Sequence, residues 1–324
     1  MALLALTLAL LAMTVTTVAI TLKPLDMALD SFDDQYQGCG PAMRAELPAL
    51  NCSEFENNPL FAKVWPKAVA KWQSEGSPVS PLSSSAQAIA IMAYTMSDLY
   101  RRFNKKVREA GRSPQEYRDN FHFKTLHFLL TNALATLRAA QGQQCRWVYR
   151  GVRMYKFKAK VGDIVRFGQF ASSTLHKNVS KKFGTTTMFK VKTCQGADIQ
   201  AYSYYSDEAE VLIPPFEEFK VTKVIEKGEK VEIHLDSIGT YSTYNCEWLR
   251  DGSVPRAPAI LEDSSWPPQP WQRPLVSSEP RRHQGHRGHC GHCGNHDHRG
   301  HLRAAVKKRR CLHAVLALGH EAVY

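Results

Sequence analysis

Two carboxylates stand two residues apart at Glu208 and Glu210, directly before the apolar run Val211 to Ile213. Such a run predicts a strand, which Pro214 and Pro215 would end. Residues i and i+2 of an extended chain point to the same face, so the carboxylates are expected side by side. A like-charged pair on a buried strand is costly unless it faces a polar cleft. The pattern indicates either a cleft with acidic chemistry or a solvated pair at a strand's start.

Two other polar groups could act with this pair. Arg150 closes a predicted strand just before Gly151, and an arginine can grip phosphate through two parallel hydrogen bonds. Ser172 belongs to a hydroxyl cluster within 167–174. Taken separately, the arginine could form a surface ion pair and the serine could cap a helix or lie in a turn.

The elements that must position these groups change type midway along the chain. Apolar residues recur at helical spacing over 51–74, 86–110 and 121–140, and Pro59 stands where a helix could begin. Alternating strand patterns follow at Trp147–Arg150, Ile164–Phe167, Thr187–Lys192, Glu210–Ile213, Phe219–Ile225 and Val231–Leu235. Helices followed by strands predict an α+β domain. No glycine-rich dinucleotide fingerprint or P-loop is present.

The two ends of the chain differ from this body. Residues 1–19 are uncharged and end in small residues, which predicts a signal peptide. Residues 251–280 are rich in proline and predict an extended linker. Residues 281–324 form a basic tail rich in His, Gly and Arg, for which we expect disorder with loose metal affinity; a specific metal site is the alternative. The catalytic body is therefore expected at 20–250.

Cysteine usage and charge fit an extracellular protein. No C-x-x-C occurs in the body, where the wide spacings predict disulfides; its cysteines are Cys39, Cys52, Cys145, Cys194 and Cys246. Asn51 and Asn178 begin sequons that could carry glycans. Part of the net charge of +12 lies in the tail; the rest belongs to the body and suits an anionic ligand or an acidic surface, with a solvated, merely basic surface as the alternative. No aromatic-interleaved basic motif points to nucleic acid.

Together and in this order, the three polar pieces resemble those of the arginine-specific vertebrate ecto-mono-ADP-ribosyltransferases and, more distantly, the clostridial-type ADP-ribosylating toxins. That family's Arg, Ser and Glu-x-Glu elements match Arg150, Ser172 and 208–210. The resemblance covers about residues 26–249 and includes the segments Ser31–Tyr36, Ala93–Thr95, Glu210–Glu217 and Ser242–Glu247. It implies helices packed on a β-sandwich-like core that binds NAD.

The resemblance also implies roles. Glu210 would stabilise positive charge on the ribose as nicotinamide leaves, as in glycoside hydrolysis. Ser172 would hold Glu210 or the ribose, and Arg150 would hold the diphosphate. Glu208 would orient the acceptor guanidinium and take its proton, which is the reason to expect arginine specificity. Tyr204 and Tyr205 would help to position the acceptor.

Further implied contacts concern the cofactor and the disulfides. Tyr94 resembles a nucleotide-contacting tyrosine and Phe183 the aromatic that stacks on nicotinamide, with core packing as the alternative for both. Gly151, Gln169 and Ser203 would line the NAD cleft. The implied disulfides are Cys39 with Cys246 and Cys145 with Cys194, and a tail cysteine is then the candidate partner of Cys52.

The sequence thus predicts a secreted, monomeric enzyme that transfers ADP-ribose from NAD to protein arginines and requires no metal, no nucleic acid and no stable membrane anchor. A first alternative is an NAD glycohydrolase, in which water replaces arginine in the same pocket. A non-catalytic binding protein on the same scaffold is the second. The third is a metal-scavenging protein that acts through the tail at 281–301.

Overall fold

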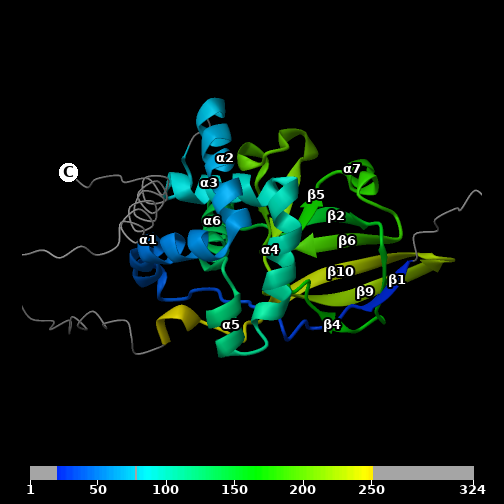
Figure 1. The fold of residues 1–324 in the computed structure, drawn as a ribbon. Helices are drawn as coiled ribbons and strands as arrows, with labels where there is room; N and C mark the ends of the chain where they lie inside the picture. The colour runs from blue at the N-terminus through cyan, green and yellow to red at the C-terminus, as the bar shows by residue number, and fades with distance from the viewer. Residues whose placement is uncertain (1–19, 77–78, 251–324) are drawn as a thin grey trace, which may run out of the picture.

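The computed structural model describes residues 20–76 and 79–250. Six helices make up the first half and lie together on one side of the molecule (Figure 1). They are α1 (Gly40–Asn57), α2 (Pro59–Glu75), α3 (Ser85–Thr95), α4 (Ser97–Ala110), α5 (Pro114–Asn120) and α6 (Lys124–Ala140). No helix in the described part of the chain is long and apolar enough to cross a membrane.

Two of the expected helices are in fact pairs of helices. The pattern over 51–74 is interrupted at Asn58, whose side chain accepts a hydrogen bond from Phe61 N at 3.1 Å and so caps α2 at Pro59. The pattern over 86–110 is broken at Met96, which has an extended backbone (φ −66°, ψ 131°). Apolar spacing alone did not show this second break, because buried residues continue on both sides of it.

The second half forms a mixed sheet of eight strands in the order β4-β9-β10-β6-β2-β5-β8-β7. β10 runs parallel to β6, and the other pairs are antiparallel. The strands are β2 (Arg146–Val152), β4 (Ile164–Val165), β5 (Ala171–Thr174), β6 (Thr187–Thr193), β7 (Ala197–Asp198), β8 (Glu210–Ile213), β9 (Glu217–Lys227) and β10 (Lys230–Thr240). A separate parallel pair joins β1 (Thr21–Pro24) to β3 (Tyr155–Lys158), and the short α7 (Lys177–Lys182) follows β5.

The sheet curves over a core of its own. β5 and β8 lie towards one edge of the sheet, and β9 and β10 lie towards the other edge. Side chains from both pairs belong to one apolar cluster, which includes Val211, Ile213, Val221 and Ile233. This shared core gives the sheet its sandwich-like character. A second and larger cluster fills the helical half and reaches the sheet through Phe170 and Leu212. The α+β class is therefore confirmed.

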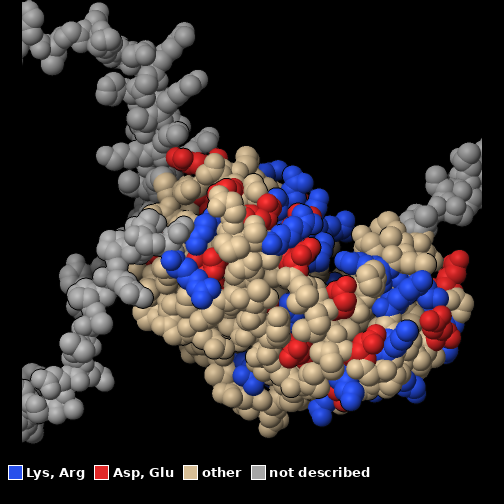
Figure 2. All heavy atoms as spheres, turned by 90° about the horizontal axis from the view of Figure 1, so that it is seen from below, with Lys and Arg blue, Asp and Glu red and all other residues tan. Residues whose placement is uncertain are grey.

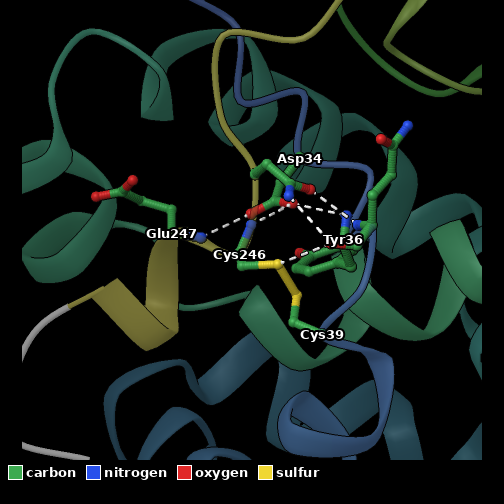
Figure 3. Close-up of a disulfide and its surroundings, with 7 residues drawn as sticks. Asp34, Tyr36, Cys39, Cys246 and Glu247 are labelled. Atoms are coloured by element: carbon green, nitrogen blue, oxygen red, sulfur yellow. Dashed lines mark hydrogen bonds between the residues drawn. A yellow bond between two sulfur atoms is a disulfide. The ribbon is translucent and has the colours of Figure 1, made fainter.

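The first and last segments of the domain are held together by two buried aspartates. Asp33 accepts hydrogen bonds from the backbone N–H groups of Thr243 (2.8 Å) and Tyr244 (3.1 Å). Its other oxygen pairs with Arg166 at 2.6 Å, and both side chains are fully buried. Asp34 accepts from the N–H groups of Cys246 and Glu247, each at 2.9 Å, beside the Cys39–Cys246 disulfide (Figure 3).

Both disulfides that the resemblance implies are present, Cys39–Cys246 and Cys145–Cys194. Cys52 is disulfide-bonded as well, and its candidate partners in the tail lie outside the described residues. So do the expected signal peptide, linker and His-rich tail.

Asn51 is fully buried in α1, which argues against a glycan there, whereas Asn178 is exposed on α7. Lys and Arg side chains gather in the upper middle of the face seen in Figure 2.

His127 is a buried base in the helical core. The Tyr36 hydroxyl lies 2.8 Å from its Nδ1 and the Phe32 carbonyl 3.2 Å from its Nε2. A neutral ring satisfies both, accepting from the hydroxyl and donating to the carbonyl. Burial lowers the pKa of His127 from 6.5 to about 3.

We expect this histidine to make the fold sensitive to acid. The neutral ring contributes fully to the free energy of unfolding above pH 6.5, which is the pKa of the histidine in the unfolded chain. This contribution is lost as the pH falls towards about 3, because in that range the unfolded chain takes up a proton and the folded chain does not. The slope is about 1.4 kcal/mol per pH unit. His127→Gln should remove this part of the slope of unfolding free energy between pH 6 and 4, measured by urea titration. His176→Gln, at an exposed histidine, should keep it. Equal slopes in His127→Gln and wild type would contradict the burial of a neutral ring.

Candidate active site

The site centres on Glu210, the first residue of β8, whose side chain is only 5% exposed. The hydroxyl of Ser203 donates to its Oε2 at 3.0 Å, and the hydroxyl of Ser172 also hydrogen-bonds to the carboxylate. Burial raises the pKa of Glu210, and the two hydroxyls oppose that rise because they stabilise the charged form. The carboxylate is fixed in position and has little contact with solvent.

Ser172 is positioned by a strand that sequence patterns did not predict. It lies on β5, opposite Leu212 of β8, so the pairing of these strands brings its hydroxyl to Glu210. The helical half supports β5 from behind: the Tyr94 hydroxyl and the Asn104 amide both donate to the Phe170 carbonyl, each at 3.0 Å. The Tyr94 hydroxyl is also 3.4 Å from the Ser172 hydroxyl.

Tyr94 is therefore a supporting residue. Its side chain is 1% exposed, and burial raises its pKa to about 12. Its ring packs against Phe103 and Phe170 in the core, as the alternative of core packing expects, and its hydroxyl is directed to Ser172. A contact between Tyr94 and a nucleotide stays a prediction.

Arg150 reaches the same point from β2. Its guanidinium donates to the Ser172 carbonyl, so the backbone of β5 lies between Arg150 and the helices. Burial lowers the pKa of Arg150, while Tyr94, Tyr100 and Glu210 act in the opposite direction. The structure thus brings Arg150, Ser172 and Glu210 together from three neighbouring strands, in agreement with the sequence prediction.

Glu208 is not placed as the strand pattern predicted. It ends a short 3-10 turn (Ser206–Glu208), and Ala209 then adopts a left-handed backbone with φ 45°. The Thr174 hydroxyl holds this turn by donating to the Glu208 carbonyl at 2.7 Å. The expectation that Glu208 lies on the strand is therefore wrong, although its carboxylate is still near enough for its charge to raise the pKa of Glu210. Glu208 is half-buried on a turn, and its pKa is raised by burial and by Asp207.

Three polar residues of α4 face this region and were missed in the sequence. Tyr100, Asn104 and Arg108 are spaced by four, which places them on one stripe of the helix. Arg108 donates to the Gln169 side chain, and burial lowers its pKa. The positive charge of Arg108 also lowers the pKa of Arg150. Within the described residues neither guanidinium forms an ion pair with a carboxylate. The i, i+4, i+8 spacing was the signal that could have revealed this stripe.

Gly151 and Phe183 belong to one packing arrangement. A Cβ at Gly151 would lie 2.1 Å from the Ser180 carbonyl oxygen and 2.4 Å from that of Gly184. Glycine is therefore needed at 151 so that α7 and the turn after it can lie against β2. Phe183 follows α7 and is 50% exposed. The structure gives Gly151 a packing role and leaves the Phe183 ring available to a ligand.

These groups fit a ligand such as NAD better than a metal ion. Two half-buried guanidinium groups that form no ion pair with a carboxylate of the described residues are suited to a diphosphate, and an exposed aromatic ring is suited to a flat heterocycle. Across the described ranges, no group of three or more His, Cys, Asp or Glu side chains is arranged to hold a metal ion.

Comparison with known proteins agrees with this site. Residues 25–243 match the family model described as NAD:arginine ADP-ribosyltransferase. The erythroblast NAD(P)(+)–arginine ADP-ribosyltransferase of Gallus gallus is 46% identical over 265 residues, covering 80% of this chain and 88% of that protein. GPI-linked NAD(P)(+)–arginine ADP-ribosyltransferase 1 of Mus musculus is 44% identical over 254 residues, 75% of this chain and 78% of that protein.

A solved structure extends the likeness to the fold. The eucaryotic mono-ADP-ribosyltransferase ART2.2 aligns with a TM-score of 0.59 at 35% identity, covering 69% of this chain and 98% of that chain. Variants of that enzyme have been solved with NADH and with NAD. The chain belongs to the NAD:arginine ADP-ribosyltransferase family.

The contact between Ser203 and Glu210 gives a direct test of the site's electrostatics. Removing the hydroxyl in Ser203→Ala withdraws a hydrogen bond from the charged carboxylate, so the pKa of Glu210 should rise further. NMR titration of the carboxyl carbon measures this shift. Ser206→Ala, at an exposed serine of the same segment, should leave the titration unchanged. An unchanged pKa in Ser203→Ala would show that the hydroxyl does not support the carboxylate.

Proposed function

We propose that this protein transfers ADP-ribose from NAD to arginine side chains of other proteins and releases nicotinamide. The observation that carries the proposal is the buried carboxylate of Glu210, held by two serine hydroxyls and close enough to Arg150 for their charges to interact. Family membership and relatives that are named arginine ADP-ribosyltransferases support the choice of reaction. We assign the catalytic domain to residues 20–250.

NAD binding would use both sides of the site. Arg150 and Arg108 would hold the diphosphate, since both are half-buried cations that form no direct ion pair with a carboxylate of the described residues, although the charge of Glu210 acts on Arg150. Gln169 would act through Arg108, which it holds by a hydrogen bond. Phe183 would stack on the nicotinamide ring from its exposed position after α7. Ser203 would act indirectly, through Glu210.

Glu210 would act at the bond that breaks. The bond from ribose C1′ to nicotinamide breaks with its electron pair passing to nicotinamide, and positive charge develops on the ribose. A carboxylate already held in place stabilises that charge without having to reorganise, so its effect is larger in the transition state than in the bound substrate. The hydroxyls of Ser172 and Ser203 would keep it oriented and ionised.

Glu208 would serve the acceptor. An arginine guanidinium is always protonated near neutral pH and is a poor nucleophile until a base removes a proton. Glu208 is half-buried with a raised pKa, on a turn that an incoming side chain can reach. As a guanidino nitrogen forms its bond to C1′, the released proton would pass to Glu208. The turn at Ala209 separates the two glutamates into a fixed, buried group and a more accessible one.

The test of this function is product analysis with the wild-type protein. Labelled NAD and the arginine analogue agmatine should yield ADP-ribosyl-agmatine and nicotinamide. Nicotinamide and free ADP-ribose without the adduct would instead make the protein an NAD glycohydrolase. Folded protein that binds NAD and cleaves none would be a binding protein, which would overturn the proposal.

Variants should separate the two glutamates. We expect Glu208→Gln to release nicotinamide and to lose at least about 100-fold in adduct formation, because the acceptor then lacks its base. Glu210→Gln should lose about 100-fold to 1000-fold in both reactions, since it removes the negative charge that stabilises the positively charged transition state. Glu229→Gln is the control, at an exposed carboxylate between β9 and β10, away from the site. Equal loss of both products in Glu208→Gln would contradict the division of roles.

We also propose that the protein acts outside the cell. Its disulfides suit an oxidising compartment, and relatives carry the names Ecto-ADP-ribosyltransferase 5 and GPI-linked ADP-ribosyltransferase 1. Fractionation of expressing cells into medium, membrane and cytosol, with and without phospholipase release, tests the location and distinguishes a free protein from an anchored one.

A further inference from the structure

A cavity of about 300 Å³ lies beside the segment that leads to Glu208. Its walls come from Lys67 and Lys71 of α2, from Met96 to Asp98 at the start of α4, and from Tyr204 and Tyr205. Figure 1 shows the segment before β8 next to α2 at the top of the molecule. No NAD-binding or catalytic role assigned above uses this cavity, although Tyr204 and Tyr205 of its wall are the two residues expected from the sequence to help position the acceptor.

The cavity is joined to the catalytic carboxylate by a short chain of hydrogen bonds. The N–H of Tyr205 donates to the Ser203 hydroxyl at 3.2 Å, and that hydroxyl donates to Glu210 at 3.0 Å. The N–H of Tyr204 donates to the Thr95 hydroxyl at 2.8 Å, which fixes this wall to the end of α3. A ligand in the cavity would therefore lie next to an arginine presented to Glu208 and Glu210.

The charges of the cavity favour an anionic side chain. It has two lysine ammonium groups and one carboxylate, Asp98, which lies in the first turn of α4. Lys71 forms an exposed ion pair with Glu75 at 2.6 Å and lies 5.6 Å from the Tyr204 ring centroid. Lys67 is exposed and forms no ion pair with the residues that the structure describes. An exposed ion pair is weak, so Lys71 can still meet an incoming carboxylate.

The size of the cavity and its aromatic wall also suit an acidic side chain. A volume of about 300 Å³ suits one or two side chains rather than a folded element. The Tyr204 and Tyr205 rings meet edge to face at 5.0 Å, and Tyr205 is 41% exposed. Such a wall can pack against the methylene groups of a glutamate while the lysines meet its carboxylate.

We propose that this cavity, which we call the flank pocket, selects acceptor proteins whose target arginine has an acidic residue beside it. The proposal rests on the proposed arginine transfer and names the substrate class for the same site. Arginines in basic segments would be disfavoured, because their neighbours would meet Lys67 and Lys71. The flank pocket would act on acceptor affinity and leave the cleavage of NAD to the groups around Glu210.

The experiment uses the whole protein, NAD and four acceptors. Three are peptides of equal length with a single arginine flanked on both sides by Glu, Gln or Lys, and the fourth is agmatine, which has no flanking residue. The measured quantity is the ratio of kcat/KM for each peptide to that for agmatine. We expect the Glu-flanked peptide to exceed the Lys-flanked peptide by about tenfold, as two weak charge contacts would give.

Charge reversal then tests the pocket itself. In the double variant Lys67→Glu/Lys71→Glu the preference should invert, and in Lys67→Gln/Lys71→Gln, which avoids new repulsion with Glu75, it should shrink to about twofold. Lys63→Glu, an exposed lysine of the same helix outside the pocket, should retain the wild-type preference.

The outcomes separate the two proposals. If agmatine is modified, three results would overturn the role of the flank pocket. They are equal ratios for all three peptides in the wild type, a preference for the Gln-flanked peptide, and a preference that survives charge reversal. Failure to modify agmatine as well would instead overturn the proposed transfer reaction.

Discussion

The burial of a single carboxylate, Glu210, is the constraint on which the architecture around the site depends. A charge with 5% of its surface exposed needs hydrogen bonds and an opposite charge close by. The segment before β8 supplies Ser203, β5 supplies Ser172, and β2 supplies Arg150. Since these come from separate parts of the chain, the strand order β2-β5-β8 is needed to bring them together. The helices then hold β5 through the Phe170 carbonyl, which joins the two halves of the domain at the site.

A second set of buried carboxylates keeps this arrangement closed. Asp33 and Asp34 bind the backbone of 243–247, and the Cys39–Cys246 disulfide crosses the same junction (Figure 3). The neighbouring Ser31 donates from its hydroxyl to the Gly168 carbonyl, one residue before Gln169. The ends of the domain are thus connected to the turn that carries Gln169 and, through it, to Arg108. Stability at the junction and geometry at the site depend on the same short segment.

Much of this could be predicted from the sequence where one pattern determined the answer. The apolar run after Glu210 predicted β8 with its observed limits, and the family resemblance carried by Arg150, Ser172 and Glu210 predicted that these residues share a site. Three features depended on contacts that spacing does not encode. β5 is a strand because it pairs with β8, although Ala171 to Thr174 has little strand pattern. The helix breaks at Met96, and the chain turns at Ala209, where a hydrogen bond from Thr174 holds Glu208 off the strand. The last of these places Glu208 on a turn and Glu210 at the start of a strand, and the proposed division of roles depends on that difference.

The central claim is that Glu210 acts on the transition state and contributes little to holding NAD. Calorimetry of NAD binding and single-turnover nicotinamide release, both compared between wild type and Glu210→Gln, test it most directly. A group that stabilises charge only as the bond breaks should leave NAD affinity within about threefold while the rate of release falls by at least about 100-fold. A loss of affinity as large as the loss of rate would contradict the claim, since Glu210 would then be a ground-state binding residue.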